Sequence, residues 1–160
     1  MVGTNVFMSD AQTHLGKLAI FRDEQRQVRV VDEDGRTVDT GFPNGSKLVS
    51  CDPMPYFALA LGICVTEFAQ RFLMRRQFPA ACSAIMAWEV DHGPRCRIDH
   101  MDIALGVTVG LSAQEKSTLL LMLEQCPLHK AIDGNIRTSM KIGSSLFQVG
   151  SLRSSLPRMR

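Results

Sequence analysis

Cysteine is the residue type in this chain best suited to do chemistry, because a thiolate is a nucleophile and can be oxidised reversibly. The chain carries five cysteines: Cys51, Cys64, Cys82, Cys96 and Cys126. An odd count at about 3% of residues lies far below the density of disulfide-stabilised scaffolds. Residues 1–14 contain no basic stretch followed by an apolar one, so no signal peptide is predicted. We therefore expect a reducing, cytoplasmic setting, in which a cysteine pair indicates redox chemistry.

Two of these cysteines lie in informative surroundings. Cys64 lies within an apolar run, residues 53–65, and by position alone this favours a small core residue. Cys126 directly precedes Pro127, so it can be the N-cap of a short helix whose N-terminus would stabilise a thiolate. His129 and Lys130 add positive charge nearby. The local features of Cys126 are equally compatible with a cysteine that merely fits a kink in the chain.

Other chemistries have weaker sequence support. Cys126 and His129 could supply two metal ligands, but the sequence has no CxxC and no second CxxH to complete a zinc site. It also has no glycine-rich phosphate loop and no nucleophile elbow. The 18 Lys and Arg residues nearly balance the 16 Asp and Glu residues, which gives a net charge of +2 and no case for nucleic-acid binding. We predict no metal, no cofactor and no nucleic-acid partner.

The first half of the chain predicts strands followed by one buried helix. Short strands are expected at 17–21, 28–30 and 37–38, with a hairpin signal at Asp34-Gly35 and a loop over 41–50. Asp52-Pro53 is typical of a helix start. The 13 residues 53–65 are apolar on almost every face, so this helix should be buried, and the run is too short to span a membrane.

The second half predicts two strands, a helix and a last strand. Residues 82–90 alternate, and the alternation of 95–109 slips by one position, which indicates a bulge near His100. Ser112 and Glu115 form a capping box that starts a helix, and Pro127 interrupts that helix. A last strand is expected at 139–148. The layout is α+β, with a single domain over 1–150 and a basic, flexible tail over 151–160.

Two segments carry a resemblance to a known family. The stretch from Asp52 to Cys64 ends in Leu-Gly-x-Cys, and the stretch from Leu111 to Ile132 begins Leu-Ser-x-x-Glu and ends with Cys-Pro-Leu-His-Lys. Together they resemble the two cysteine motifs of the OsmC/Ohr proteins, the osmotically inducible and organic hydroperoxide resistance proteins. The separation of Cys64 and Cys126, 62 residues, also suits that family. The resemblance covers the chain from about residue 15 to residue 149.

The resemblance implies a fold and an activity. The fold would be α+β, with two central helices packed on curved antiparallel sheets and two chains intertwined as a homodimer. Cys64 would attack an organic hydroperoxide, Cys126 would resolve the resulting sulfenic acid as a disulfide, and a dithiol reductant would reopen that disulfide. Apolar walls around the site would bind the tail of the peroxide. No membrane partner is implied.

The chain departs from the family at one position. The family carries a glutamate before the first cysteine, which orients an arginine that activates the thiolate, but residues 53–56 contain no acid. Arg22 is the first candidate for the arginine and Arg29 the second. Glu67, one turn after Cys64, is a possible substitute for the glutamate, although its position favours a helix-surface or interface charge. The alternative function is therefore a dimeric OsmC-like protein that binds a small ligand or senses oxidation without catalytic turnover.

Overall fold

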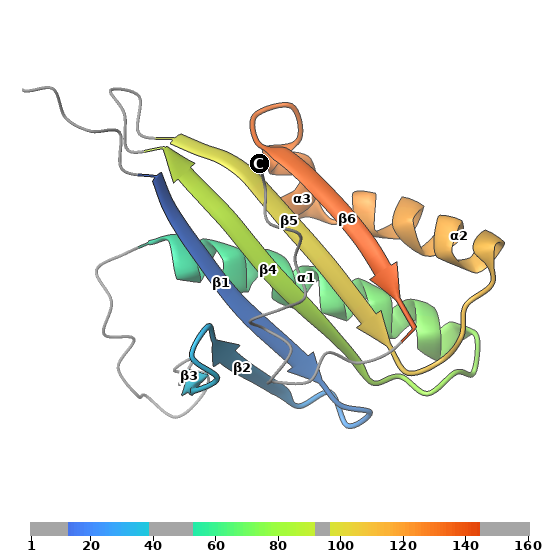
Figure 1. The fold of residues 1–160 in the computed structure, drawn as a ribbon. Coiled ribbons are helices and arrows are strands. Elements are labelled where there is room, and N and C mark those ends of the chain that lie inside the picture. Colours follow the sequence, from blue (N-terminus) through green and yellow to red (C-terminus); the bar gives the residue numbers. More distant parts are fainter. Residues whose placement is uncertain (1–12, 39–52, 92–96, 145–160) are drawn as a thin grey trace, which may run out of the picture.

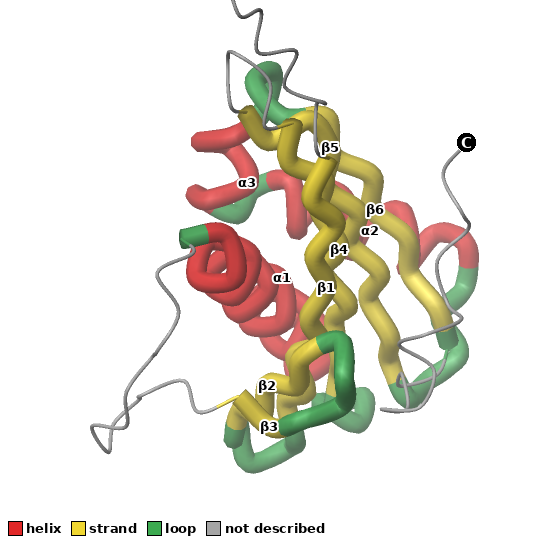
Figure 2. The backbone as a smooth tube through the Cα atoms, turned by 60° about the vertical axis from the view of Figure 1, so that its left-hand side comes forward, coloured by secondary structure: helices red, strands yellow, loops and turns green. Residues whose placement is uncertain are grey.

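The computed structural model describes residues 13–38, 53–91 and 97–144. Its elements are β1 (Thr13–Arg22), β2 (Val28–Asp32), β3 (Thr37–Val38), α1 (Met54–Arg75), β4 (Cys82–Asp91), β5 (Arg97–Val107), α2 (Ala113–Glu124), α3 (Pro127–Ile132) and β6 (Arg137–Gly143). The strands form one sheet in the order β3-β2-β1-β4-β5-β6. In Figure 1 the three helices lie behind this sheet, and Figure 2 shows the sheet nearly edge-on beside α1. The predicted α+β class is confirmed, while the homodimer stays a prediction because the structure is of one chain.

The sheet differs from the antiparallel expectation at one edge. The pairs from β3 to β5 are antiparallel, but β6 runs parallel to β5. Two parallel strands need a crossover connection, because a tight turn can only reverse the chain. Here α2 and α3 form that connection, which brings the N-cap of α3 back over the sheet.

Helix α1 lies across the sheet and forms the centre of the core. It contacts β1 and β4, and residues on its sheet-facing side, such as Leu61 and Val65, are at most 1% exposed. Gly62 allows this close packing, since a methyl group at that position would overlap the side chain of Ile20 on β1. The 22 residues of α1 are long and apolar enough to cross a membrane, but core helices pass the same test, and its burial against the sheet fits a core helix.

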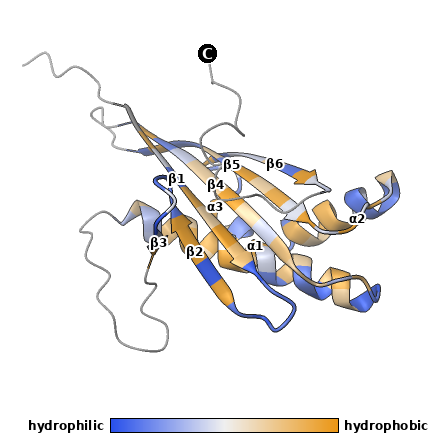
Figure 3. Ribbon diagram, turned by 60° about the horizontal axis from the view of Figure 1, so that its bottom comes forward, coloured by the Kyte–Doolittle hydropathy of each residue, from blue (hydrophilic) through white to orange (hydrophobic). Residues whose placement is uncertain are grey.

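The predicted local signals are found where they were expected. Ser112 accepts from the Glu115 backbone N–H while Glu115 accepts from the Ser112 backbone N–H, which confirms the capping box. The pairing of β4 with β5 shifts between Glu89 and Val90 and leaves Asp99 as the extra residue, which confirms the bulge beside His100. Figure 3 shows the β1–β2 turn as hydrophilic, in contrast to the apolar strand centres.

Some predictions lie outside the described residues. They are the loop over 41–50, the end of the last strand beyond residue 144, the tail over 151–160, and the surroundings of Cys51 and Cys96.

Candidate functional site

Cys64 and Cys126 form a disulfide that joins α1 to the N-cap of α3. Their Cα atoms lie 6.6 Å apart, within the range that a disulfide requires. The two residues are 62 positions apart, so the fold itself brings them together. The crossover of α2 and α3 does this, because it returns the chain to the side of the sheet on which α1 lies.

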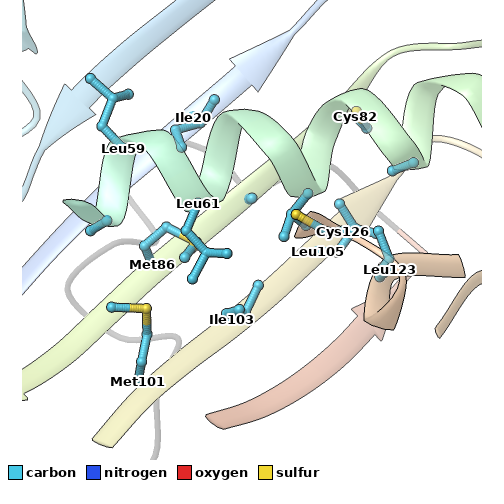
Figure 4. Packing of buried hydrophobic residues seen from close by; sticks show 14 of the residues in the cluster. Ile20, Leu59, Leu61, Cys82, Met86, Met101, Ile103, Leu105, Leu123 and Cys126 are labelled. Carbon is cyan, nitrogen blue, oxygen red and sulfur yellow. The ribbon is translucent and has the colours of Figure 1, made fainter. Parts of the chain in front are cut away.

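The two cysteines of the pair differ in accessibility. Cys126 is fully buried, and Figure 4 shows it beside Leu105 and Leu123 in the core. Cys64 is only partly buried at the edge of the same core. A molecule that arrives from solvent therefore meets Cys64 before it meets Cys126.

A cluster of charged side chains lies one helical turn beyond Cys64. The Glu67 carboxylate accepts from Nη1 of Arg22 at 2.8 Å, from Nε of Arg71 at 2.9 Å, and from Arg26. Burial tends to raise the pKa of Glu67, but the hydrogen bond from Arg71 and the charges of all three arginines outweigh it and lower that pKa. We call these four residues the Glu67 cluster. With three guanidinium groups on one carboxylate it carries a net positive charge beside the turn that holds Cys64.

Arg22 is the buried member of the Glu67 cluster. It is 7% exposed, and its Nε lies 3.4 Å from Oγ1 of Thr66. Among the described residues its polar partners are Thr66 and Glu67, so it is held against the turn that follows Cys64 rather than against the disulfide itself. Arg26 comes from the β1–β2 turn and has a positive φ of 67°, a conformation that the turn and the ion pair together hold in place.

One expectation from the sequence is refined here and another is corrected. Glu67 was expected to be a helix-surface or interface charge; its side chain is 19% exposed and pairs with buried Arg22, so it is not an isolated surface charge, and its place at an interface stays a prediction. Arg29, the second candidate for the activating arginine, lies on the other face of the sheet. Its guanidinium stacks 4.9 Å from the centre of the Phe21 ring, and Phe21 alternates in β1 with the residues that face α1. Arg29 is therefore remote from the cysteine pair.

Cys82 is another cysteine near the Glu67 cluster, and it belongs to no sequence motif. It pairs with Arg22 across β4 and β1, and its thiol donates to the Thr66 carbonyl at 3.5 Å. Burial raises the pKa of Cys82 to about 12, against the opposing effect of the Arg22 charge. This thiol therefore stays protonated at neutral pH.

Sequence reasoning missed several members of this site. Glu67 and Arg71 are four residues apart on a helix, so their ion pair was a local signal that could have been found. Arg26, Thr66 and Cys82 join the site through tertiary contacts that no local pattern encodes.

His129 belongs to the surroundings of α3. Its Nε2 lies 3.3 Å from Oγ1 of Thr138, and its buried Nδ1 has no hydrogen-bond partner. Within the described ranges 13–38, 53–91 and 97–144, no group of three His, Cys, Asp or Glu residues could hold a metal ion. Cys126 is occupied by the disulfide, so it offers no thiolate to a metal in this state.

Solved structures with this α+β fold are similar to the chain. An OsmC-like protein from Mycoplasma pneumoniae superposes with a TM-score of 0.50 at 12% identity, over 84% of this chain and 99% of that one. A protein from Psychrobacter arcticus, provisionally named as an osmotic stress induced and detoxification response protein, gives 0.54 at 17% identity, over 72% and 87%. A protein from Lactobacillus casei, provisionally named as a redox protein, gives 0.50 at 13% identity, over 88% and 95%.

These similarities are structural. The sequence matches no model of a protein family, and no curated protein matches it. The chain therefore has the fold of the OsmC/Ohr proteins, and the resemblance inferred from its two cysteine motifs is confirmed at the level of the fold.

Proposed function

We propose that this protein reduces organic hydroperoxides with a dithiol as the electron donor, using Cys64 as the nucleophile and Cys126 as the resolving thiol. The observation that carries the proposal is the disulfide between Cys64 and Cys126 in a fold shared with OsmC-like structures. The unequal burial of the two residues supports the assignment of roles, because the nucleophile has to meet the peroxide and the resolving thiol does not.

The chemistry divides into three steps. The Cys64 thiolate attacks one peroxide oxygen, the O–O bond breaks, and the alcohol leaves after it takes up a proton, so Cys64 becomes a sulfenic acid. The Cys126 thiol then attacks the Cys64 sulfur, the S–S bond forms and water leaves. A dithiol reopens the bridge by two successive thiol–disulfide exchanges and is itself oxidised to a disulfide. The disulfide between Cys64 and Cys126 is the product expected of the second step, which supports this sequence of steps.

The Glu67 cluster supports the first step electrostatically. A thiolate near fixed positive charge has a lowered pKa, so more of it is ionised at neutral pH. Arg22 is the member best suited to this role, because its guanidinium is buried and is fixed by Glu67 and Thr66. In this assignment Glu67 replaces the acid that is missing from residues 53–56 and orients Arg22 from the other side of Cys64.

The proposal includes a setting and partners. A thiol cycle of this kind needs a reducing compartment and a supply of dithiol, which we assign to the cytoplasm. The outer side of α1 carries apolar residues that are only partly buried in one chain, such as Phe57 and Phe68. A second copy of the chain that packs on α1 would cover them, and this supports a homodimer. Apolar walls formed in this way would favour peroxides with organic tails over hydrogen peroxide.

The decisive experiment measures consumption of cumene hydroperoxide by the protein with dithiothreitol as the dithiol. Cys64→Ser should lower the rate by at least about a thousandfold, because the nucleophile is removed. Cys82→Ser is the matched control: it changes a cysteine of the same neighbourhood, and its hydroxyl can still donate to the Thr66 carbonyl, so the rate should stay close to that of the wild type. Equal rates for the wild type and Cys64→Ser would eliminate the proposal.

The same assay separates the alternative function. A sensor would form the Cys64–Cys126 disulfide once, with one equivalent of peroxide, and then turn over slowly in excess dithiol. The observation that favours this alternative is the absence of an acid from residues 53–56. Many turnovers per minute of an organic hydroperoxide would eliminate it.

A further inference from the structure

Cys126 is the buried member of the cysteine pair, and its chemistry requires a route for a proton. The residue is fully buried and lies beside Leu105 and Leu123 in the core (Figure 4). Apolar surroundings oppose the thiolate, so the reduced form of such a cysteine is an uncharged thiol. This thiol has to lose its proton when its sulfur attacks Cys64, and the sulfur has to regain a proton when the disulfide is reopened.

His129 lies next to Cys126 in α3. Cys126 is the N-cap of this helix and His129 is its third residue. The Lys130 backbone N–H donates to the Cys126 carbonyl at 3.0 Å, so the first helical turn starts at Cys126. Residues three apart are neighbours on a helix, and helical side chains lean toward the N-terminus, so the side chain of His129 is directed back toward Cys126. The side chains of the N-cap and the third residue meet in a capping box for the same reason.

The two ring nitrogens of His129 have different surroundings. Nε2 lies 3.3 Å from Oγ1 of Thr138 on β6, whereas Nδ1 is buried and has no hydrogen-bond partner among the described residues. A neutral imidazole has one N–H group and one bare nitrogen. When the Nε2–H group donates to Thr138, the bare nitrogen is Nδ1, which can then accept a proton. Buried polar atoms without a partner are rare in folded proteins, so this nitrogen requires an explanation.

His129 also borders a cavity of about 510 Å³ between α2, α3 and β6. Thr138, Glu124, Lys130 and Asp133 line the same cavity, and the last three are exposed, so the cavity is in contact with water. Cys126 is 0% exposed and therefore has no contact with solvent of its own. His129 thus lies between a buried thiol and a cavity that can take up or supply protons.

We infer that His129 carries the proton of Cys126 between the core and this cavity, as a general base when the disulfide closes and as a general acid when it opens. In closing, Nδ1 takes the thiol proton as the Cys126 sulfur attacks the Cys64 sulfenic acid. The S–O bond breaks, and the leaving hydroxide becomes water with a proton that balances the one held by the imidazolium. In opening, a dithiol attacks the Cys64 sulfur, the S–S bond breaks, and the imidazolium protonates the Cys126 sulfur. The inference rests on the proposed function for its place in a peroxide cycle.

The first test closes the disulfide without a peroxide. One equivalent of 5,5′-dithiobis(2-nitrobenzoate), added to the reduced protein, releases one thionitrobenzoate when Cys64 attacks it. Cys126 then attacks the mixed disulfide on Cys64 and releases a second thionitrobenzoate, at a rate independent of the reagent concentration. His129→Gln keeps a donor for Thr138 but removes the base, so the first phase should not change and the second should slow at least about tenfold at pH 7. Equal second-phase rates would overturn the inference.

The pH dependence separates a base from a structural role. In His129→Gln the second phase should accelerate with pH toward the wild-type rate, because hydroxide then ionises the Cys126 thiol without a base. Glu124, Lys130 and Asp133 are the other titratable groups among the described residues that line the cavity. Glu124→Gln is the matched control, since it also removes a proton acceptor from the cavity, and both phases should stay unchanged. A second phase that stays slow in His129→Gln at every pH, or equal slowing in Glu124→Gln, would contradict a general base at His129.

The second test uses the wild type and needs no substitution. In protein with ¹⁵N-labelled histidine, the nuclear magnetic resonance signal of His129 Nδ1 should shift when the disulfide is reduced, because the Cys126 thiol becomes its hydrogen-bond donor. His100, whose Nε2 lies 2.8 Å from Oδ1 of Asp102 on β5, is the internal reference and should not shift. An unchanged Nδ1 signal would refute the role of His129.

Turnover of cumene hydroperoxide tests the proposed function separately. A protein that closes its disulfide with the nitrobenzoate reagent in two phases, but does not consume the peroxide, would lose the peroxidase assignment and keep His129 as the proton carrier. A protein that consumes the peroxide at the same rate in the wild type and in His129→Gln, with equal second phases, would keep the peroxidase assignment and lose the role of His129.

Discussion

Cys64 and Cys82 approach the same short stretch of α1 from different directions and have very different surroundings. Cys64 lies two residues before Thr66 in the helix, and Cys82 donates its thiol to the Thr66 carbonyl from β4. Arg22 lies near both cysteines. It pairs with Cys82 in the sheet, and it contacts Thr66 and Glu67 in the helical turn after Cys64. Cys64 is partly buried and has a disulfide partner, whereas Cys82 is 1% exposed and is a free thiol.

The difference shows that an adjacent arginine is not sufficient to activate a thiol. The charge of Arg22 lowers the pKa of Cys82, but desolvation by burial is the larger effect and raises that pKa to about 12. Cys64 is only partly buried, so desolvation should oppose ionisation of its reduced thiol less than it does at Cys82. We therefore propose that burial determines which of the two thiols can be activated by this charge once the disulfide is reduced.

The largest expected effect is the difference in reactivity between the two thiols. In fully reduced protein at pH 8, a pKa of about 12 leaves about one Cys82 in ten thousand as thiolate, so Cys64 should react with iodoacetamide at least about a thousandfold faster. Peptide mapping by mass spectrometry at timed intervals measures both rates. In 8 M urea the two cysteines should react at similar rates, which is the control for intrinsic reactivity. Comparable alkylation rates of Cys64 and Cys82 in the folded protein would contradict the proposed difference in their thiol pKa values.

The second effect tests Arg22 directly. Arg22→Met keeps most of the buried volume and removes the charge, so the pKa of the Cys64 thiol should rise by about one unit and its reaction with cumene hydroperoxide at pH 7 should slow about tenfold. Arg29→Met is the matched control, because Arg29 stacks on Phe21 at the other face of the sheet, and it should leave the rate unchanged. Stopped-flow measurement of a single oxidation gives the rate. An unchanged rate in Arg22→Met would show that Arg22 is structural.

The sequence predicted the local features of the molecule better than the contacts between residues distant in the chain. The capping box at Ser112 and the bulge predicted near His100 are local patterns, and each reports a contact between residues close in the chain or in a regular ladder. The pairs of Glu67 with Arg22 and Arg26 were missed because these partners are more than forty positions away, whereas its pair with Arg71 is a local signal four residues along the helix. The parallel pairing of β6 was also missed, since strand patterns predict burial and not direction.

The third effect concerns the Glu67 carboxylate that holds Arg22. Glu67→Gln should lower the free energy of unfolding at pH 7 by about 1–3 kcal/mol, because a largely buried guanidinium loses its counter-charge. The pKa of Glu67 is lowered in the folded protein, so its stabilisation is fully present above the unfolded value near 4.3 and is lost as the pH falls below that value. Urea unfolding of both proteins from pH 7 to pH 3 should show the difference shrinking below about pH 4. If the difference in free energy of unfolding between the two proteins stays constant over this pH range, the charge of the Glu67 carboxylate does not contribute to stability.

The same variant also separates two roles of Glu67. If Glu67 acts only as a nearby negative charge, its removal leaves more net positive charge and the Cys64 thiol should become more acidic and faster. If it orients Arg22, as we propose, Glu67→Gln should slow the oxidation of Cys64 in the same direction as Arg22→Met. The sign of the change in rate therefore distinguishes the two roles.

The smallest expected effect concerns the hydroxyl of Thr66. Its Oγ1 is 3.4 Å from Nε of Arg22 and also donates to the Gly62 carbonyl at 3.0 Å, so Thr66→Val removes one weak contact of Arg22 without changing the shape of the side chain. We expect the oxidation of Cys64 to slow by about twofold to threefold and the free energy of unfolding to fall by about 0.5–1.5 kcal/mol. The thiol of Cys82 donates to the Thr66 backbone carbonyl, which the substitution retains, so the low reactivity of Cys82 should not change. A rise in Cys82 alkylation together with a normal rate at Cys64 would reverse this expectation, because it would mean that Thr66 maintains the burial of Cys82 rather than the position of Arg22.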